Sequence, residues 1–479
     1  MDQLVFEYLN GKLHGHIHDL RFHQGENTLL EGTGPLLIGE NQRLMIEICA
    51  PAPLGEDPQL LSGLADRSRP VQFSGSFVGT PIRQPFKVQG TLGGGLRGHC
   101  AAANNRWWRH YVDGIEFQFR STDLGRCRFH GVVQPWPNYA LSLSRGVIKD
   151  ENALFGEVVA HYHCWSFDFG NFRIAIRDNA IHRVGEIVAE GPSSEGQSIE
   201  KLADAILKGI SLRWGYEMEW LCNSFEIQDL ETFRLYPDAL ERKENHRWHK
   251  PPVVVGPFQD GTNERFLACA VRYFLKDDDI ELFKYLRLFW RTGPAGSLEL
   301  RESVVGAAIE GIAKQVLRKR ATEEQRKEMD CVEQSFRELK KSILGHIEGS
   351  SAITSNEHYD SVRKSIESLD YRVAKQLIIV ASNVLGFSVT NDELKSWADL
   401  RNAAAHGRNV YVDIDSKRLH DFETCVTLLN KFSMALIGYE GYYQDYAHPD
   451  GNEQFKLIGR SRAVSNGSFV DGGLKKQHS

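Results

Sequence analysis

The residue types best suited to chemistry lie together in the segment Leu400-Arg-Asn-Ala-Ala-Ala-His-Gly407. A guanidinium stays charged at physiological pH and grips phosphate oxygens in a fork, whereas an imidazole with an ordinary pKa of about 6.5 can accept or donate a proton. Cleavage of RNA by its own 2′-hydroxyl needs a proton acceptor, a proton donor and a cation near the charged phosphorus centre. Arg401 and His406 are therefore candidates for phosphodiester cleavage.

An arginine followed by a histidine five residues later also occurs at Arg177 and His182. This second pair lies between strand-like segments, where Asp178-Asn179 is typical of a hairpin turn. The spacing by itself carries no function, so we interpret Arg177 and His182 as a coincidental match.

The first pair differs because a helix is expected around it. Thr390-Asn-Asp-Glu393 matches a capping box at a helix N-terminus, and Gly407 suits the left-handed residue that ends a helix. These signals predict a helix from Leu394 to His406, with Arg401 in its last two turns.

Other helices are expected on both sides of this segment. Apolar residues recur at intervals of three and four from Leu298 to Leu317, which predicts one buried helical face. Thr322-Glu-Glu-Gln325 is another capping box, and Gly386 is placed to end a helix over Tyr371 to Leu385. A last helix is expected over Lys417 to Ile437. The pattern predicts a bundle of four or five helices.

The first half of the chain instead shows the two-residue alternation of strands. Turn residues separate these runs at Gly93-Gly-Gly95, Asp113-Gly114 and Asp178-Asn179, which favours a β-sandwich or a related β-rich domain. The clearest helix in this half covers Ser198 to Ile210. The alternating runs are Leu44–Ile48, Val71–Phe77, Ile115–Phe119 and Phe172–Ile176.

These patterns predict an α+β protein with several domains, as the length of 479 residues also indicates. Two prolines after His246-Arg-Trp-His-Lys mark a boundary, because they remove hydrogen-bond donors and favour extended chain. The expected parts are a β-rich, sandwich-like regulatory domain at 1–255, a helical connector at 256–296, an all-α bundle at 297–445 and a disordered tail at 446–479.

The segment from Arg401 to His406 resembles the R-[polar]-x-x-x-H motif of HEPN-domain ribonucleases, which are helical bundles found in toxins and phage-defence effectors. The helical order over 297–440 is similar to that of such a domain. The resemblance implies that Arg401 binds the phosphate, that His406 serves as acid and base, and that Asn402 orients the phosphate or the histidine. It also implies a reaction without a metal or another cofactor.

The wider plan, a β-rich half followed by a HEPN domain, resembles the ApeA-type anti-phage defence proteins. This resemblance implies RNA as the substrate, with transfer RNA among the targets, and a phage protein as the trigger sensed through the N-terminal domain. Five helical residues place Arg401 and His406 about 140° apart, so one copy is poorly arranged for both proton transfers. A homodimer or higher homo-oligomer formed through the HEPN domain would bring two copies of the motif into one cleft.

Composition limits the protein class. With 57 Lys+Arg against 63 Asp+Glu, the net charge of −6 gives no global attraction to nucleic acid or to an anionic membrane. The chain shows no long apolar segment and no signal-peptide pattern at Met1, and its eight cysteines form no C-x-x-C pair. We therefore expect a cytoplasmic protein with reduced thiols and no membrane partner.

Other groups are interpreted as structural. His14-Gly-His-Ile-His18 would place three imidazoles on one strand face, but no further ligand completes a metal site there, and His161-Tyr-His-Cys164 is equally incomplete. Gly93 to Gly98 fits G-x-G-x-x-G by letters and is expected to be a flexible loop. The aromatic group Arg106 to Tyr111 is interpreted as core and rim, with base stacking as the alternative.

The basic residues Lys314, Arg318, Lys319 and Arg320, with Arg408, are interpreted as a solvated helix face, with RNA phosphate contact as the alternative. Two other functions stay open at this stage. One is a non-catalytic HEPN bundle used for dimerisation or binding, with a partner-recognising β domain. The other is a β-rich hydrolase that uses the histidines at 14–18 or 161–163.

Overall fold

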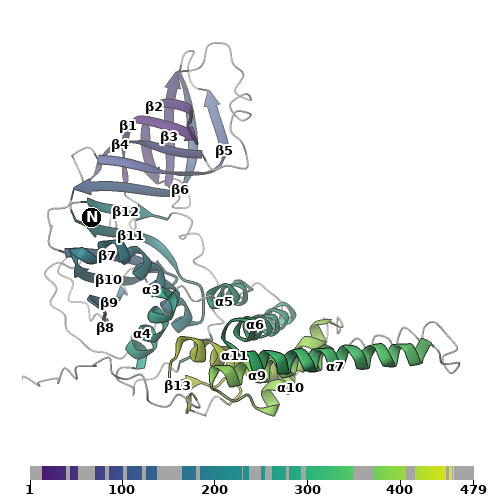
Figure 1. The fold of residues 1–479 in the computed structure, drawn as a ribbon. Coiled ribbons are helices and arrows are strands. Elements are labelled where there is room, and N and C mark those ends of the chain that lie inside the picture. Colours follow the sequence, from purple (N-terminus) through teal and green to yellow (C-terminus); the bar gives the residue numbers. More distant parts are fainter. Residues whose placement is uncertain are drawn as a thin grey trace, which may run out of the picture. The chain divides into compact units, whose positions relative to one another are not determined.

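Strands dominate the first half of the chain and helices the second half (Figure 1). The protein divides into two compact units. The β unit comprises residues 1–249 and 255–276, and the helical unit comprises residues 250–254 and 277–479. The computed structural model describes residues 13–38, 44–51, 71–80, 86–100, 105–120, 126–136, 164–179, 184–228, 230–236, 250–253, 262–276, 280–292, 298–348, 370–405, 416–448, 452–455 and 457.

The β unit is built on one antiparallel sheet of 12 strands in the order β3-β2-β1-β4-β5-β6-β12-β11-β7-β10-β9-β8. The strands are β1 (His14–Gln24), β2 (Asn27–Ile38), β3 (Leu44–Pro51), β4 (Val71–Thr80), β5 (Phe86–Cys100), β6 (Asn105–Arg120), β7 (Arg126–Gln134), β8 (Cys164–Phe169), β9 (Phe172–Asn179), β10 (Val184–Pro192), β11 (Glu219–Ile227) and β12 (Leu230–Leu235).

The first six strands close into a ring because β3 pairs with both β2 and β6. Inside the ring the rings of Phe77, Phe86 and Phe117 contact one another, with centroids 5.2 to 5.5 Å apart. Phe73 and Ile17 are fully buried beside them. Closure lets six strands enclose an apolar core without any covering helix.

Strand β6 belongs to two parts of the sheet. Its first half, from Asn105 to Tyr111, pairs with β3, and its last half, from Ile115 to Arg120, pairs with β12. From β12 onward the sheet is open and needs a cover on one face. Helices α3 (Ile199–Trp214) and α4 (Thr262–Leu275) supply that cover over β7, β8 and β11 (Figure 1).

A buried arginine joins these two helices to the sheet. Arg213 is fully buried, and its Nε donates a hydrogen bond of 2.7 Å to the Asn263 side chain on α4. The guanidinium lies 4.9 Å from the ring centroid of Trp214 and 5.9 Å from that of Trp165 on β8. Aromatic faces stabilise a cation that water cannot reach.

The α+β organisation with a β-rich N-terminal half is confirmed, but the sandwich-like arrangement is not, because the strands form one continuous sheet. Two turn predictions were also wrong. Gly93-Gly-Gly95 and Asp113-Gly114 lie inside β5 and β6, where the register between the two strands shifts, so they mark irregularities within the strands instead of hairpin turns. The expected helix at Ser198–Ile210 is present as α3, after the short 3₁₀ helix η2 (Ser193–Ser198).

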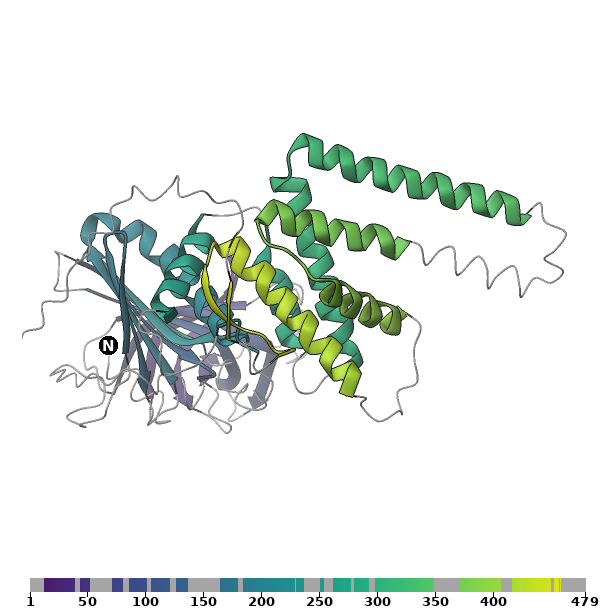
Figure 2. The same cartoon turned by 90° about the horizontal axis from the view of Figure 1, so that it is seen from below.

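The helical unit contains most of the helices expected from the sequence (Figure 2). Its described helices are α5 (Leu282–Arg291), α6 (Leu298–Arg320), α7 (Glu323–Glu348), α9 (Asp370–Leu385), α10 (Asn391–Ala405) and α11 (Ser416–Ile437). Two short strands, β13 (Gly441–Gln444) and β14 (Asn452–Phe455), pair after α11. Among the described residues, no helix has the length and apolar character needed to cross a bilayer.

The predicted capping boxes are confirmed. The Thr390 N–H donates to Glu393 Oε2 at 2.8 Å and the Glu393 N–H donates to Thr390 Oγ1 at 3.1 Å. Thr322 and Gln325 make the same reciprocal pair at 2.9 and 3.2 Å. Gly386 ends α9 with a φ of 83°, as its position predicts.

Two predicted parts are divided differently in the structure. The expected connector at 256–296 holds α4, which belongs to the β unit, and α5, which belongs to the helical unit. The prediction of a disordered tail from 446 was wrong for β14, because Phe455 and Leu457 are buried against the helical unit.

Strand β2 lies so close to its neighbour β3 that Gly34 has no room for a side chain. A Cβ on Gly34 would collide with the Glu47 carbonyl oxygen, whereas a Cβ on Gly114 would have only ordinary contacts, the nearest 3.7 Å away. We expect Gly34→Ala to destabilise the β unit by about 1–3 kcal/mol, because backbone must move. Gly114→Ala should change stability by less than about 1 kcal/mol. Hydrogen exchange of the β2 and β3 amides checks both values.

Candidate functional site

The predicted motif lies at the C-terminal end of α10. Arg401 lies in the last two turns of that helix, and the backbone of Asn402 continues it. The side chain of Asn402 lies outside the described residues, as do His406 and Gly407, which directly follow the helix. Of the three candidate side chains in the motif, the structure therefore describes that of Arg401, and the surroundings of Arg401 are given below.

Arg401 is held from two sides. Its Nε lies 3.3 Å from Glu310 Oε2 on α6, and its guanidinium carbon lies 5.6 Å from the ring centroid of Trp397. The Arg401 side chain keeps 37% of its surface exposed, whereas Glu310 keeps 17%. The ion pair and the aromatic face restrict the guanidinium to one region while leaving part of it open to solvent.

Trp397 fixes the distance between α10 and α6. Its indole is fully buried, and its Nε1–H donates a hydrogen bond of 3.2 Å to the Gly306 carbonyl oxygen. Trp397 and Arg401 are four residues apart on α10, and Gly306 and Glu310 are four apart on α6. Residues four apart lie on the same face of a helix. The contact of Trp397 with Gly306 and that of Arg401 with Glu310 therefore lie one turn apart along the same α10–α6 interface.

A buried ion pair supports this helix contact at the other end of α6. Arg418 on α11 donates two hydrogen bonds to Glu302, at 2.7 and 2.6 Å, and lies 3.2 Å from Glu299. The Glu302 side chain is only 1% exposed. Hydrogen bonding to Glu302 raises the pKa of Arg418 above its ordinary value, so the guanidinium stays charged.

Polar contacts also join α10 to α11. Ser396 donates a buried hydrogen bond of 2.7 Å to Asp421, and Lys431 lies 2.8 Å from Glu393, the capping residue of α10. Cys425 lies in the same core, where burial, followed by Asp421, raises the pKa of its thiol well above its ordinary value. Cys425 is thus a packing residue and not a nucleophile.

Sequence reasoning missed Glu310 and Trp397. Lys314, which was considered for RNA contact, lies 2.7 Å from the same Glu310, so this carboxylate is shared by two cations. The only available signal was the spacing of Glu302, Gly306 and Glu310 along α6, which does not say what they face. Arg408 lies outside the described residues.

The histidines of β1 lie together but do not form a metal site. His14, His16 and His18 alternate with the buried Ile17, as predicted, and the rings of His16 and His18 are 4.8 Å apart. Burial, followed by the neighbouring His18, lowers the pKa of His16. Within the described part of the chain, no three His, Cys, Asp or Glu side chains are grouped so that they could hold a metal ion.

The remaining predicted groups are only partly described. His161 and His163 lie outside the described residues, and so do the side chains from Arg106 to His110, although their backbone forms part of β6. Tyr111 is 45% exposed. The Gly93–Gly98 segment, which was expected to be a flexible loop, is instead part of β5; it pairs with β6 at Gly93, Arg97 and Gly98, with a register shift between Gly93 and Arg97.

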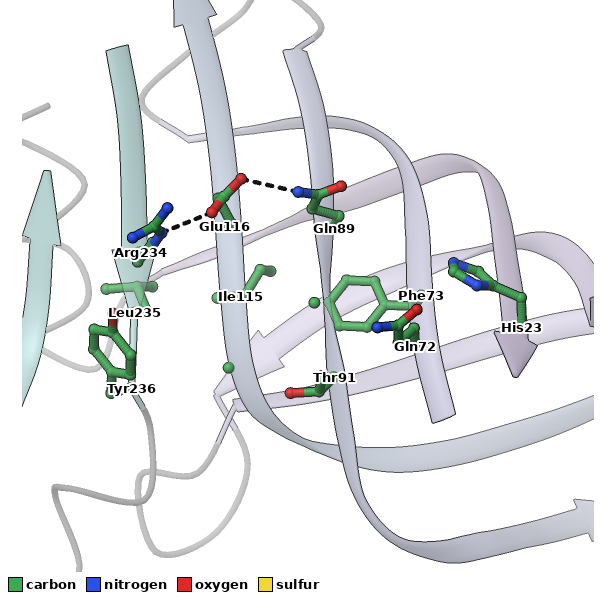
Figure 3. A pocket seen from close by; sticks show the side chains of 12 residues that line it. His23, Gln72, Phe73, Gln89, Thr91, Ile115, Glu116, Arg234, Leu235 and Tyr236 are labelled. Carbon is green, nitrogen blue, oxygen red and sulfur yellow. Dashed lines mark hydrogen bonds and ion pairs between the residues drawn. The ribbon is translucent and has the colours of Figure 1, made fainter. Parts of the chain in front are cut away.

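A polar cavity of about 320 Å³ opens on the outer face of the β unit, where the closed ring meets the open sheet (Figure 3). Glu116 on β6 stands between Arg234 and Gln89 (Figure 3). It accepts hydrogen bonds of 2.7 Å from Arg234 and 2.9 Å from Gln89. Arg234 also donates to Glu200 at 3.1 Å.

The charged groups of this cavity neutralise one another. Burial alone would raise the pKa of Glu116, but hydrogen bonds from Arg234, Gln118 and Gln89 outweigh it and the net effect lowers the pKa. Glu116 is therefore a fixed, ionised carboxylate with its partners in place. Such a group orders the junction of β5, β6 and β12 and is poorly suited to general acid catalysis at neutral pH.

Comparison with protein-family models, with curated proteins and with solved structures finds no match for this chain. The resemblance to HEPN ribonucleases thus depends on the motif and on the order of the helices.

The buried pair of Glu302 and Arg418 should dominate the stability of the helical unit. Arg418→Ala leaves the Glu302 carboxylate, which is 1% exposed, without its bidentate partner, and we expect a loss of about 3–5 kcal/mol. Glu323→Ala, which removes a carboxylate 81% exposed and 2.8 Å from Lys327, should cost less than about 1 kcal/mol. Urea unfolding followed by circular dichroism at helical wavelengths compares them. Equal losses would contradict this assignment.

The lowered pKa of Glu116 predicts an acid-dependent stability of the β unit. A carboxylate whose folded pKa lies below its unfolded value stabilises the fold above the unfolded pKa of 4.5, and this contribution is lost as pH falls through the folded value. Glu116→Gln should therefore lose more stability near neutral pH than at about pH 3. Thermal unfolding across this range measures the difference, with Glu26→Gln in the β1–β2 turn as the control.

Proposed function

We propose that this protein is a HEPN-type endoribonuclease that acts in anti-phage defence and cleaves RNA without a bound metal. Its substrates would include transfer RNA, and a phage protein would act as the trigger through the β unit. The observation that supports the proposal most directly is the placement of Arg401 at the end of a capped, firmly packed helix.

Arg401 has the properties that a phosphate-binding residue needs. Arg401 contacts Glu310 through its Nε atom. The other N–H donors of its guanidinium remain, and the side chain is 37% exposed. A non-bridging phosphate oxygen could accept those donors while Glu310 and Trp397 hold the stem in place. Preorganised positive charge of this kind stabilises the negative charge that develops on phosphorus.

His406 follows α10 immediately and supplies the proton transfers in this proposal. Its neutral form would accept the proton of the 2′-hydroxyl, and a protonated copy would donate a proton to the leaving 5′-oxygen. A homodimer of the helical unit would supply one histidine for each transfer. Asn402, next to Arg401 on α10, would orient the phosphate or the imidazole.

A non-catalytic binding protein is the second candidate. The ion pair between Arg401 and Glu310 joins α10 to α6, and such a pair can serve packing alone. The two functions differ in what they require of His406. A binding module needs only the helix contacts, whereas the ribonuclease needs the imidazole itself.

RNA cleavage tests the proposal. Total RNA from infected and uninfected cells expressing the wild type, Arg401→Ala or His406→Ala would be sequenced for new 5′-hydroxyl ends, and the purified proteins would be assayed in EDTA. We expect each substitution to lower the cleavage rate by about 10²–10⁴-fold, since each removes a transition-state contact. Wild-type cleavage should persist in EDTA.

The second Arg and His pair provides a matched control. His182→Ala removes a histidine with the same spacing from an arginine in the β unit and should leave cleavage unchanged. Arg401→Lys keeps the charge but not the fork and should retain only part of the activity. Equal cleavage by wild type and His406→Ala, or protection from phage without any RNA loss, would contradict the ribonuclease and favour the binding protein.

A further inference from the structure

The long helix α7 carries an apolar stripe that the proposed ribonuclease does not use. Val332, Phe336, Leu339 and Ile343 follow one another at intervals of four, three and four residues. This spacing is the a and d pattern of a heptad repeat, in which apolar side chains line one seam of a coiled coil. Met329 continues the pattern toward the N-terminus of the helix but is already buried, at 5% exposure.

Helix α7 extends past the other drawn helices of the helical unit, as both ribbon views show (Figures 1 and 2). Leu339 is 48% exposed, and Val332, Phe336 and Ile343 are half-buried. The residues between them are charged or polar, and all of them except the half-buried Lys340 are exposed. An extended helix with one apolar seam is more stable when a second helix covers that seam.

The charges beside the seam distinguish the two ways in which a second copy could pair. With Phe336 at an a position, Glu328 is at g, and Glu333 and Lys340 are at e. A parallel pair would bring Glu328 against Glu333 of the other copy, which places like charges together. An antiparallel pair brings Glu333 against Lys340 of the other copy, and the two-fold axis repeats this favourable contact.

We propose that α7 is a homotypic interface, in which two copies of this protein pair their α7 helices antiparallel. The inference does not depend on the ribonuclease activity. The axis lies between residues 337 and 338, so Val332 packs against Ile343 of the second copy and Phe336 packs against Leu339 of the second copy. Symmetry repeats both layers, which gives four apolar layers over two heptads.

In the same antiparallel pair, the other flank of the apolar seam carries no charge. It brings Ser335 at a g position next to Ser342 of the second copy, so no like charges meet there. A two-heptad seam is short for independent stability. Pairing through α7 would therefore work best as an addition to the dimer expected at the motif, where it joins two such dimers into one tetramer and acts at two places at once.

Charge reversal tests the pairing and its direction. Glu333→Lys and Lys340→Glu should each weaken association by about tenfold, because two attractive contacts become repulsive. The double variant Glu333→Lys/Lys340→Glu should restore association. Light scattering coupled to gel filtration of the full chain would show the mass of the assembly halved in the single variants and recovered in the double variant.

Seam variants separate this effect from misfolding. Leu339→Glu should halve the mass, whereas Leu300→Glu, at a leucine on α6 that is 48% exposed, should not. Circular dichroism would confirm that each variant folds.

Cross-linking tests the register. In a Cys331→Ser background, a short bis-maleimide should join Ser335→Cys to Ser342→Cys in a mixture of the two variants, and should not join either variant to itself. Absence of this cross-link, together with a mass unaffected by Leu339→Glu, would overturn the proposal. It would assign the seam to residues 349–369 of the same chain, which follow α7.

Discussion

Glu302 sets the central constraint of the helical unit, because a carboxylate that is 1% exposed must keep a charged partner. Removing a carboxylate from water without compensation costs several kcal/mol. Arg418 provides that compensation with two hydrogen bonds, which requires α11 to lie across the first turns of α6. Once α11 is placed, the hydrogen bond from Ser396 to Asp421 aligns α10 with it.

The position of Arg401 follows from the same constraint. Helix α10 is tied to α6 where the Trp397 indole donates its hydrogen bond to the Gly306 carbonyl oxygen. The next turn then brings Arg401 to Glu310. The motif arginine is thus held by a framework of buried groups, and part of its side chain stays open to solvent. Rigid support of this kind is what a phosphate-binding residue requires.

The β unit solves a different problem, since a long antiparallel sheet leaves edges that must be paired or covered. Closure of β3 onto β6 removes edges at one end, and α3 and α4 cover the open part. The polar cavity forms where these two parts meet, and Glu116 with Arg234 neutralises its charge. A surface with internally satisfied charges suits recognition by shape and hydrogen bonding more than attraction of polyanions.

Much of the local structure could be predicted from the sequence, because the physical causes act over three or four residues. Capping boxes at Thr322 and Thr390, the glycine stop at Gly386 and the period of the apolar residues depend on neighbours in the chain. The division into a β-rich half and a helical half follows from the same periodicities. The candidate motif from Arg401 to His406 was also visible, because its residue types stand close together.

Tertiary structure alone decided the contacts between distant residues. Glu310 and Arg401 are far apart in the chain, and nothing local distinguishes Glu310 from the other acidic residues of α6. Gly93-Gly-Gly95 forms an irregularity inside β5 instead of a turn, because β5 pairs with β6 on both sides of it, at Gly93 and at Arg97. Chain sequence by itself determined which elements form, and packing determined which side chains meet, because burial depends on every element at once.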